Sequence, residues 1–150
     1  MKIVVDADSC PRQIRSIIRK AARRLSLEAH FAADRELADC TGPGIFMHVV
    51  SPGMDEADRK LESLAASGDL AVTRDVILAA SLVAAGCVVI DDRGGIYTEE
   101  NMAERLSLRN VMTEFRDAGI HFQKNRPLSQ QDVQKFANAL DSQLTRLLKS

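Results

Sequence analysis

The chain has 150 residues, of which 45% are hydrophobic and 27% are charged, and this length and composition predict one globular domain over residues 1–150. The 20 lysines and arginines nearly balance the 21 aspartates and glutamates, which excludes the chain-wide positive field of a nucleic-acid coat protein but leaves local basic patches open. Three cysteines without Cys-x-x-Cys spacing, and no apolar run near the ~18 residues of a membrane span, indicate a protein of the reducing cytoplasm.

Short apolar runs alternate with segments of helical period along the first two-thirds of the chain. This pattern is typical of β-α-β units and predicts an α/β fold with a central parallel sheet of about five strands and helices on both faces. The expected strands are residues 3–5, 28–33, 46–50, 70–73 and 87–90. The expected helices between them are residues 11–25, 55–66 and 75–85.

From Thr98 onward the pattern is helical only. Thr98 is a suitable N-cap for a helix through Leu106, and a second helical segment is expected up to about Ala118. Ser129 is expected to cap a last helix, with Asp132 at its third position. We expect this helical C-terminal segment to pack on the sheet rather than to form a domain of its own.

Aspartates follow the predicted strands at their carboxyl ends. They are Asp6 and Asp8 after the first strand, Asp55 and Asp58 after the third, Asp75 after the fourth, and Asp91 with Asp92 after the fifth. The carboxyl ends of parallel strands share one edge of a sheet, where ligands bind, so these carboxylates can converge. Their mutual repulsion is relieved by a divalent cation, and oxygen ligands favour Mg²⁺ or Mn²⁺. Such a cation activates water and holds phosphate oxygens, which favours phosphoryl chemistry.

The same aspartates also fit a purely structural role. Aspartate is a favoured N-cap residue, and the helices of β-α-β units begin at this edge, so Asp8, Asp55 and Asp75 can be caps alone. Asp6 fits that alternative less well, because aspartate is depleted in strands. Its spacing to Asp8 turns both acids to one side of an extended segment. Capping and metal ligation therefore both stay open here.

The helix expected at residues 11–25 is basic and has no acidic residue. Arg12, Arg15 and Arg19 follow helical spacing and form a ridge that can track the phosphate backbone of RNA. The structural alternative is a solvated helix face. Because only 4% of residues are aromatic and none is tryptophan, we expect contacts with the backbone of a nucleic acid to dominate over base stacking.

Several motifs, taken in this order, resemble the uncharacterised bacterial YaiI/YqxD family over nearly the whole chain. They are Val5-Asp6-Ala7-Asp8-x-Cys10-Pro11, Gly53-x-Asp55-x-Ala57-Asp58, Gly68-Asp69-Leu70, Thr73-x-Asp75 with Leu78-Ala79, Tyr97-Thr98 with Asn101, and Arg116-x-x-Gly119. That family is regarded as PIN-like (similar to the PilT N-terminal domain), and PIN domains are metal-dependent ribonucleases. The resemblance implies a Mg²⁺ or Mn²⁺ site formed by Asp6, Asp8, Asp58 and Asp75, with Asp55 as a further member. The sequence departs from the family pattern at Val76-Ile77 and at Asn125-Arg126-Pro127.

These observations predict a metal-dependent ribonuclease that hydrolyses phosphodiesters with a metal-activated water. Asp6, Asp8, Asp58 and Asp75 are the expected catalytic residues. One alternative is a module that binds RNA or a partner without catalysis. Another is a phosphatase similar to the haloacid dehalogenases, suggested by Asp6-x-Asp8, Thr73 and Asp91-Asp92. We disfavour the phosphatase because it requires a lysine that is absent between Lys60 and Lys124, and Arg74 is no equivalent.

Overall fold

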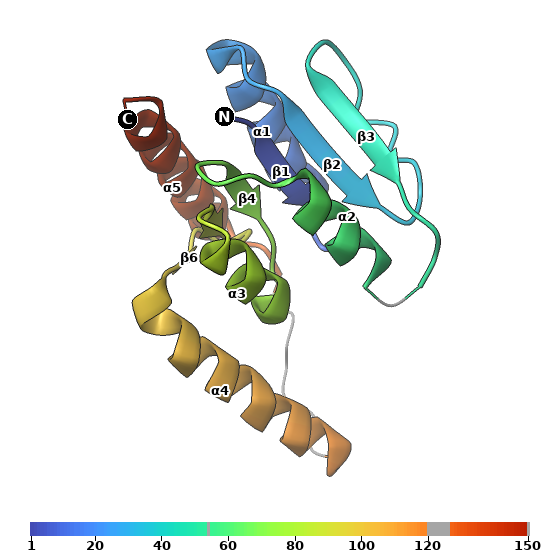
Figure 1. The fold of residues 1–150 in the computed structure, drawn as a ribbon, viewed down its shortest axis with the longest axis vertical. Helices are drawn as coiled ribbons and strands as arrows, with labels where there is room; N and C mark the ends of the chain where they lie inside the picture. The colour runs from blue at the N-terminus through green and yellow to red at the C-terminus, as the bar shows by residue number, and fades with distance from the viewer. Residues whose placement is uncertain (54, 120–126, 150) are drawn as a thin grey trace.

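Six strands form one sheet in the computed structural model, which describes residues 1–53, 55–119 and 127–149 (Figure 1). The strands are β1 (Ile3–Asp6), β2 (Ala29–Ala33), β3 (Ile45–Val49), β4 (Leu70–Val72), β5 (Val88–Ile90) and β6 (Ile96–Tyr97). They lie in the order β3-β2-β1-β4-β5-β6, with β1 to β5 parallel and β6 antiparallel to β5. The predicted α/β class with a mostly parallel sheet is confirmed. The additional strand, β6, is too short to show an alternating pattern in the sequence.

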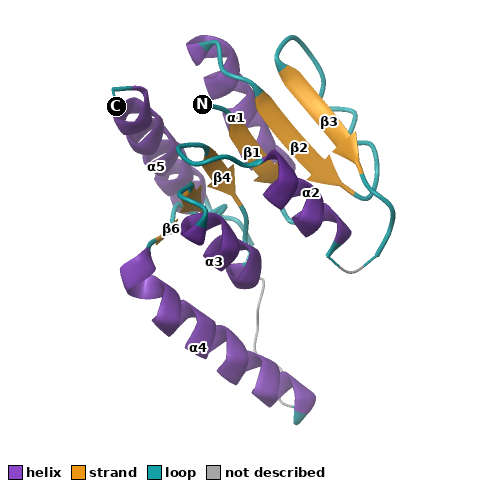
Figure 2. Ribbon diagram, in the orientation of Figure 1, coloured by secondary structure: helices purple, strands orange, loops and turns teal. Residues whose placement is uncertain are grey.

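Five helices occur in the described part of the chain (Figure 2). They are α1 (Arg12–Leu25), α2 (Glu56–Leu64), α3 (Val76–Ala84), α4 (Glu99–Asp117) and α5 (Gln130–Leu148). Helices α1 and α5 cover one face of the sheet, α2 and α3 cover the other, and α4 packs against α3. Helices therefore lie on both faces, as predicted. Lys124, which was used in the argument against a phosphatase, and Asn125 and Arg126, where the sequence departs from the family pattern, lie outside the described residues.

Helix α4 corrects the sequence prediction for residues 98–118. Two helical segments were expected, but α4 is one continuous helix of 19 residues. A capping box formed by Thr98 and Asn101 starts it, and no glycine or proline interrupts it. The expected cap of the last helix is confirmed, because Ser129 and Asp132 form the capping box of α5.

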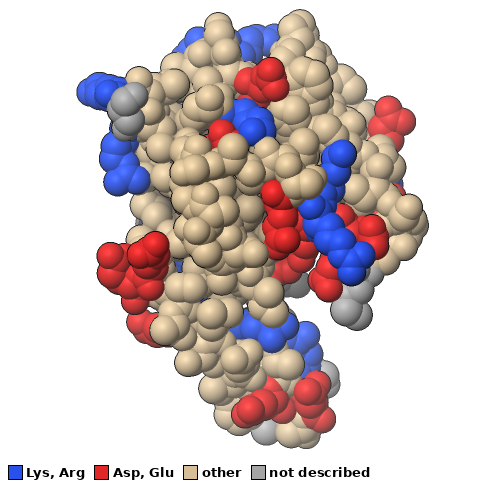
Figure 3. Space-filling model, in the orientation of Figure 1, with Lys and Arg blue, Asp and Glu red and all other residues tan. Residues whose placement is uncertain are grey.

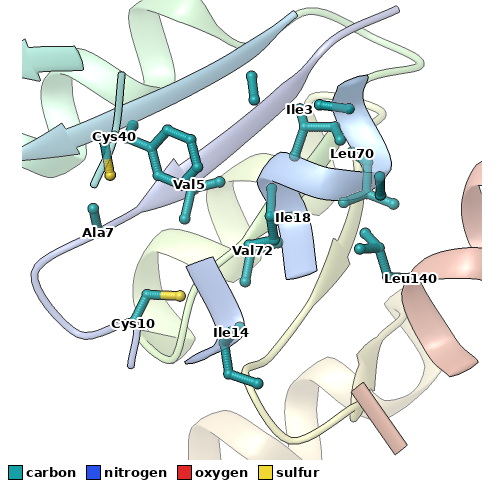
Figure 4. Close-up of a cluster of buried hydrophobic side chains, with 14 of the residues drawn as sticks. Ile3, Val5, Ala7, Cys10, Ile14, Ile18, Cys40, Leu70, Val72 and Leu140 are labelled. Atoms are coloured by element: carbon teal, nitrogen blue, oxygen red, sulfur yellow. The ribbon is translucent and has the colours of Figure 1, made fainter. Parts of the chain in front are cut away.

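Two apolar layers attach the helices to the sheet. The layer under α1 and α5 contains Ile3 and Val5 of β1, together with Ile14, Ile18, Phe31, Leu70, Val72, Phe136, Leu140 and Leu144 (Figure 4). The layer under α2 and α3 contains Val4 of β1, together with Leu61, Ala71, Leu78, Leu82, Val89 and Tyr97. Because successive residues of a strand point to opposite faces, β1 contributes to both layers. Strands β1 and β4 are thus buried on both faces, which fixes the position of their carboxyl ends.

The direction of chain progression reverses between β1 and β4. From β1 the chain adds β2 and β3 on one side; α2 then crosses back over the sheet, and β4 and β5 follow on the other side. The chain leaves β1 toward α1 on one face and leaves β4 toward α3 on the opposite face. Two diverging connections leave a crevice at the carboxyl edge, the position where open α/β sheets bind ligands.

Helix α5 packs on the same face of the sheet as α1. Phe136, Leu140 and Leu144 are fully buried in the shared apolar layer, so the C-terminal helix packs on the sheet as expected. Within the described ranges, no helix combines the length and the apolar character needed to cross a lipid bilayer.

Candidate functional site

Acidic side chains from three segments lie around one crevice: the end of β1 with the loop that follows it, helix α2, and the start of α3 after β4. The parallel register pairs Val5 with Val72, so the next residues, Asp6 and Thr73, follow side by side. By the alternation of strand side chains, both lie on the face covered by α2 and α3. A pocket of about 370 Å³ at this place is lined by Asp6, Asp8, Ser9, Arg74 and Asp75.

Asp6 is the most deeply placed acid of this pocket, with an exposed fraction of 8%. Its Oδ2 accepts hydrogen bonds from the Thr73 hydroxyl at 3.0 Å and from the Ser9 hydroxyl at 3.3 Å. Burial raises the pKa of Asp6, and the charges of Asp75 and Asp8 add to this increase, while the two hydroxyl bonds oppose it. The Thr73 hydroxyl also accepts the backbone N–H of Asp75 at 3.0 Å, so one side chain positions both acids.

Asp58 comes to the same place from α2. Burial raises its pKa to about 7, and the nearby charges of Asp75 and Asp6, together with a hydrogen bond shared with Asp75, act in the same direction. The structure therefore brings Asp58, Asp75 and Asp6 close enough to repel one another, although more than 60 residues separate the first of them from the last in the sequence. Such crowding of negative charge is the property that a bound cation relieves.

Asp8 and Asp55 lie at the rim of this cluster. Asp8 is exposed and accepts the backbone N–H of Asp34 at 3.1 and 3.3 Å. Its pKa is raised, first by partial burial and then by the charge of Asp34. Asp55 is also exposed, at the N-cap position of α2, and its charge contributes to the raised pKa of Asp58.

The capping alternative holds for one of the three aspartates to which it applied. Asp75 caps α3, since its Oδ1 accepts the backbone N–H of Ile77 at 2.9 Å and of Leu78 at 3.3 Å. Asp55 makes no side-chain cap bond, and the N-cap position of α1 belongs to Pro11 rather than Asp8. Both cap bonds of Asp75 use one oxygen, so capping and a role in the acidic cluster are compatible for this residue.

Asp91 and Asp92 stand apart from this cluster in structural roles. Oδ1 of Asp91 accepts the backbone N–H groups of Arg93 and Gly95 at 2.8 and 2.9 Å and so closes the turn between β5 and β6. Asp92 is buried and forms an ion pair with Arg74. That pair holds a cationic side chain at the pocket. Sequence reasoning did not include Arg74 among the candidate site residues, although its place between Thr73 and Asp75 at a strand end was the available signal.

The arginines of the basic ridge on α1 differ in their exposure to solvent. Arg12 is exposed at the start of the helix, as expected for a phosphate contact. The Arg15 side chain is only 11% exposed, because its guanidinium donates to Asp39 at 2.9 and 3.1 Å and to the Cys10 carbonyl at 2.7 Å. Arg19 is half-buried, and its Nε has no hydrogen-bond partner among the described residues. A phosphate contact by Arg15 would require its ion pair with Asp39 to break.

The acidic cluster fits a hard cation in one particular mode. It offers carboxylate oxygens, which are the ligands that Mg²⁺ and Mn²⁺ prefer. No three His, Cys, Asp or Glu side chains of the described residues form a ready-made metal cage. Mg²⁺ typically keeps several waters and uses one or two carboxylates together with substrate phosphate oxygens. The cluster therefore fits a cation that is shared with a phosphate substrate.

Comparisons with known proteins find similarity over the full chain. A family model described as "Uncharacterized BCR, YaiI/YqxD family" matches residues 4–146. A UPF0178 protein of Myxococcus xanthus is 47% identical over 150 residues, covering 100% of this chain and 98% of that protein. UPF0178 proteins of Treponema pallidum and Geobacter sulfurreducens are 42% and 45% identical, covering 99% of this chain and 84% and 99% of their own. No solved structure matches the chain.

Proposed function

The chain belongs to the YaiI/YqxD family, and we propose that it is a PIN-like, metal-dependent ribonuclease. The family name carries no activity, so the proposal stands on the site. The observation that supports it most is the convergence of Asp6, Asp58 and Asp75 at the point where chain progression across the sheet reverses. A parallel sheet with helices on both faces and acids at its carboxyl edge also agrees with the resemblance to PIN domains.

Each pocket residue has a definite part in this proposal. Asp6 and Asp75 hold the cation together with Asp58, and Asp8 and Asp55 add negative charge at the rim. When bound, Mg²⁺ or Mn²⁺ supplies Lewis-acid stabilisation of the phosphate and a water of lowered pKa. Arg74 is 41% exposed beside the acids and offers guanidinium donors to a phosphate oxygen while Asp92 holds its orientation.

The proposed reaction is hydrolysis of an RNA phosphodiester, with water as the nucleophile. The acids position the cation, and Arg74 with the exposed Arg12 contacts the phosphate backbone. The phosphatase alternative gains no support from the geometry. That alternative needs Asp91 and Asp92 in its active site. In the structure Asp91 closes a turn and Asp92 pairs with Arg74, so both carboxylates are used in structural contacts.

The test is cleavage of mixed single-stranded and double-stranded RNA with Mn²⁺, with Mg²⁺ and with EDTA. Asp75→Asn is the decisive variant, because asparagine caps helices as well as aspartate does and only the negative charge is lost. We expect cleavage by the wild type with metal, and a rate reduced roughly 10²-fold or more in Asp75→Asn. Asp141→Asn, on the exposed surface of α5, is the matched control and should cleave like the wild type.

Two results would contradict the proposal. One is equal cleavage by the wild type and Asp75→Asn. The other is absence of cleavage together with a thermal stability that metal does not change. The second result would favour the non-catalytic module. Turnover of p-nitrophenyl phosphate without RNA cleavage would instead favour the phosphatase.

A further inference from the structure

A groove runs between α4 and the body of the molecule, beside the acidic pocket. It has a volume of about 650 Å³ and is lined by Val76 at the start of α3 and by residues of α4 that include Arg105, Leu108, Arg109, Met112 and Arg116. Val76 directly follows Asp75, which lines the acidic pocket. The groove and the acidic pocket are therefore lined by consecutive residues at the N-terminus of α3.

The α4 side of the groove is positively charged. Arg105, Arg109 and Arg116 follow helical spacing and share one face of α4. Among the described lining residues Glu104 is the one acid. Arg105 is held by Asp91 at 3.7 Å and lies over the Tyr97 ring, whereas Arg109 and Arg116 are exposed. Figure 3 shows basic side chains on the part of α4 beside the notch, across from acidic side chains on the body, while the far end of α4 also carries acidic side chains.

Apolar side chains lie between these cations. Leu108 is 62% exposed although it lines the groove, and Met112 lies one turn further along the same face. Ile77, the next residue after Val76, is also exposed. A surface on which arginines alternate with apolar side chains is suited to a single-stranded nucleic acid. The arginines can contact its charged phosphates, and the apolar side chains can contact the flat faces of its bases.

We propose that this groove holds single-stranded RNA on its way to the acidic pocket, with Arg109 and Arg116 on phosphates and Leu108 and Met112 against bases. The inference rests on the proposed function, because the acidic pocket gives the strand its destination. Charge favours RNA over a protein partner. A ligand that lies both in the basic groove and beside the cation of the acidic pocket must be negatively charged along its length, as the backbone of RNA is. A duplex is disfavoured because its base faces are stacked inside and leave Leu108 and Met112 without a partner.

The test measures RNA binding without cleavage. A short fluorescein-labelled single-stranded RNA is titrated in EDTA by fluorescence anisotropy at several salt concentrations. For Arg109→Ala/Arg116→Ala we expect an affinity about 10-fold lower, and a slope of log affinity against log salt that is smaller by about 1.4, since each phosphate contact on a single strand contributes about 0.7. Lys135→Ala/Lys149→Ala, which removes two charges from exposed positions on or next to α5, is the matched control and should change neither quantity.

A second variant separates the apolar contacts from the charges. Leu108→Ser should weaken binding of single-stranded RNA but leave the salt slope unchanged, because no phosphate contact is lost. Both groove variants should keep the thermal stability of the wild type, since the substituted side chains are exposed. An unlabelled duplex should compete less well than an unlabelled single strand.

The outcomes distinguish this inference from the proposed ribonuclease activity. Unchanged RNA affinity in Arg109→Ala/Arg116→Ala, or no RNA binding by the wild type, overturns the inference even if RNA is cleaved. Loss of affinity confined to the groove variants supports it, even if no cleavage is seen and the ribonuclease proposal fails. A change of sedimentation coefficient in the groove variants, with RNA affinity unaltered, overturns it in favour of an interface between two copies of the chain.

Discussion

Asp58 titrates very differently from an ordinary aspartate. Its pKa in the folded protein is about 7, because burial and the charges of Asp75 and Asp6 disfavour the ionised form. Since this pKa lies above the unfolded value, folding binds a proton at Asp58 between about pH 4 and pH 7. Stability from this group is therefore present at low pH and is lost as the pH rises through 7.

Asp58→Asn should therefore stabilise the protein when metal is absent. At about pH 8 in EDTA we expect a melting temperature roughly 2–8 °C above that of the wild type, after allowance for solvent screening. The difference should shrink as the pH falls and disappear near pH 3, where aspartate is mostly protonated in both states. Thermal denaturation across this pH range measures it. A wild type that is the more stable of the two at pH 8 in EDTA would contradict the assigned repulsion.

Metal should reverse this order. If Asp58 is a ligand of the cation, as proposed, Mn²⁺ binding requires it to give up its proton, so the wild type should gain stability with Mn²⁺ at pH 8 and little at pH 5. The Asp58→Asn variant should gain less at either pH. Isothermal calorimetry in two buffers of different ionisation enthalpy measures the released proton directly. Metal binding without proton release near neutral pH would separate Asp58 from the cation.

Thr73 is a positioning residue for the acidic pocket. Its buried hydroxyl donates to Asp6 and accepts from the Asp75 backbone. Thr73→Val keeps the shape and removes both bonds, and we expect Mn²⁺ affinity to fall about 10–100-fold. Thr73→Ser keeps the hydroxyl and should stay within a few-fold of the wild type. Equal affinity of the valine and serine variants would show that the hydroxyl does not orient the ligands.

At the scale of elements, the start of α5 is joined to the turn between β5 and β6 by an ion pair. Arg93 donates to Asp132 at 2.7 Å, and the Asp132 side chain is 3% exposed. The same carboxylate accepts the backbone N–H of Ser129 in the capping box. One side chain therefore caps a helix and anchors it to the sheet at once.

Asp132→Ala should lower the free energy of unfolding by about 2–4 kcal/mol, because it removes both the cap and the buried partner of Arg93. Asp141→Ala is the control on the same helix. Its pair with Arg24, at 3.5 Å, is exposed on both sides, and its loss should cost less than about 0.5 kcal/mol. Urea denaturation of the two variants gives the comparison, and equal costs would refute the anchoring role.

At the scale of the whole molecule, the two apolar layers share the strands of one sheet. Phe136 is fully buried in the layer under α1 and α5, while Tyr97, the one tyrosine of the chain, is buried in the other layer. If the chain is one domain, both layers unfold together. Tyrosine fluorescence and far-ultraviolet circular dichroism then report on different parts of a single transition.

Phe136→Ala should lower stability by about 3–5 kcal/mol and shift both signals by the same amount. The reason is that loss of the α5 contacts removes support from β1 and β4, which also form the other layer. Thermal or urea denaturation followed by the two signals measures the shift. Displacement of the dichroism curve alone would mean that α5 unfolds as a separate unit and would contradict the single-domain prediction.

Much of the fold follows from the sequence itself. The alternation of apolar runs with helical segments is a local property, and it predicts the parallel strands and helices α1, α2 and α3 near their observed bounds, together with the start of α5. Local chemistry also predicts the caps, since Ser129 with Asp132 and Asp75 act within four residues. The sequence prediction was wrong for residues 98–118, where it expected two helical segments although no glycine or proline between Thr98 and Ala118 stops a single helix. It also missed β6, because two residues are too few to show a period.

The positions of the aspartates after the strands come from the sequence, but their individual roles come from the tertiary structure. Only packing decides that Asp58 meets Asp75 and Asp6, that Asp92 pairs with Arg74, and that Arg15 is tied to Asp39. Each of these contacts joins residues that lie on different elements. The pKa of a carboxyl group and the position of a guanidinium depend on burial and on charges from residues distant in the sequence. The spacing of residues along the chain predicts neither burial nor those neighbours.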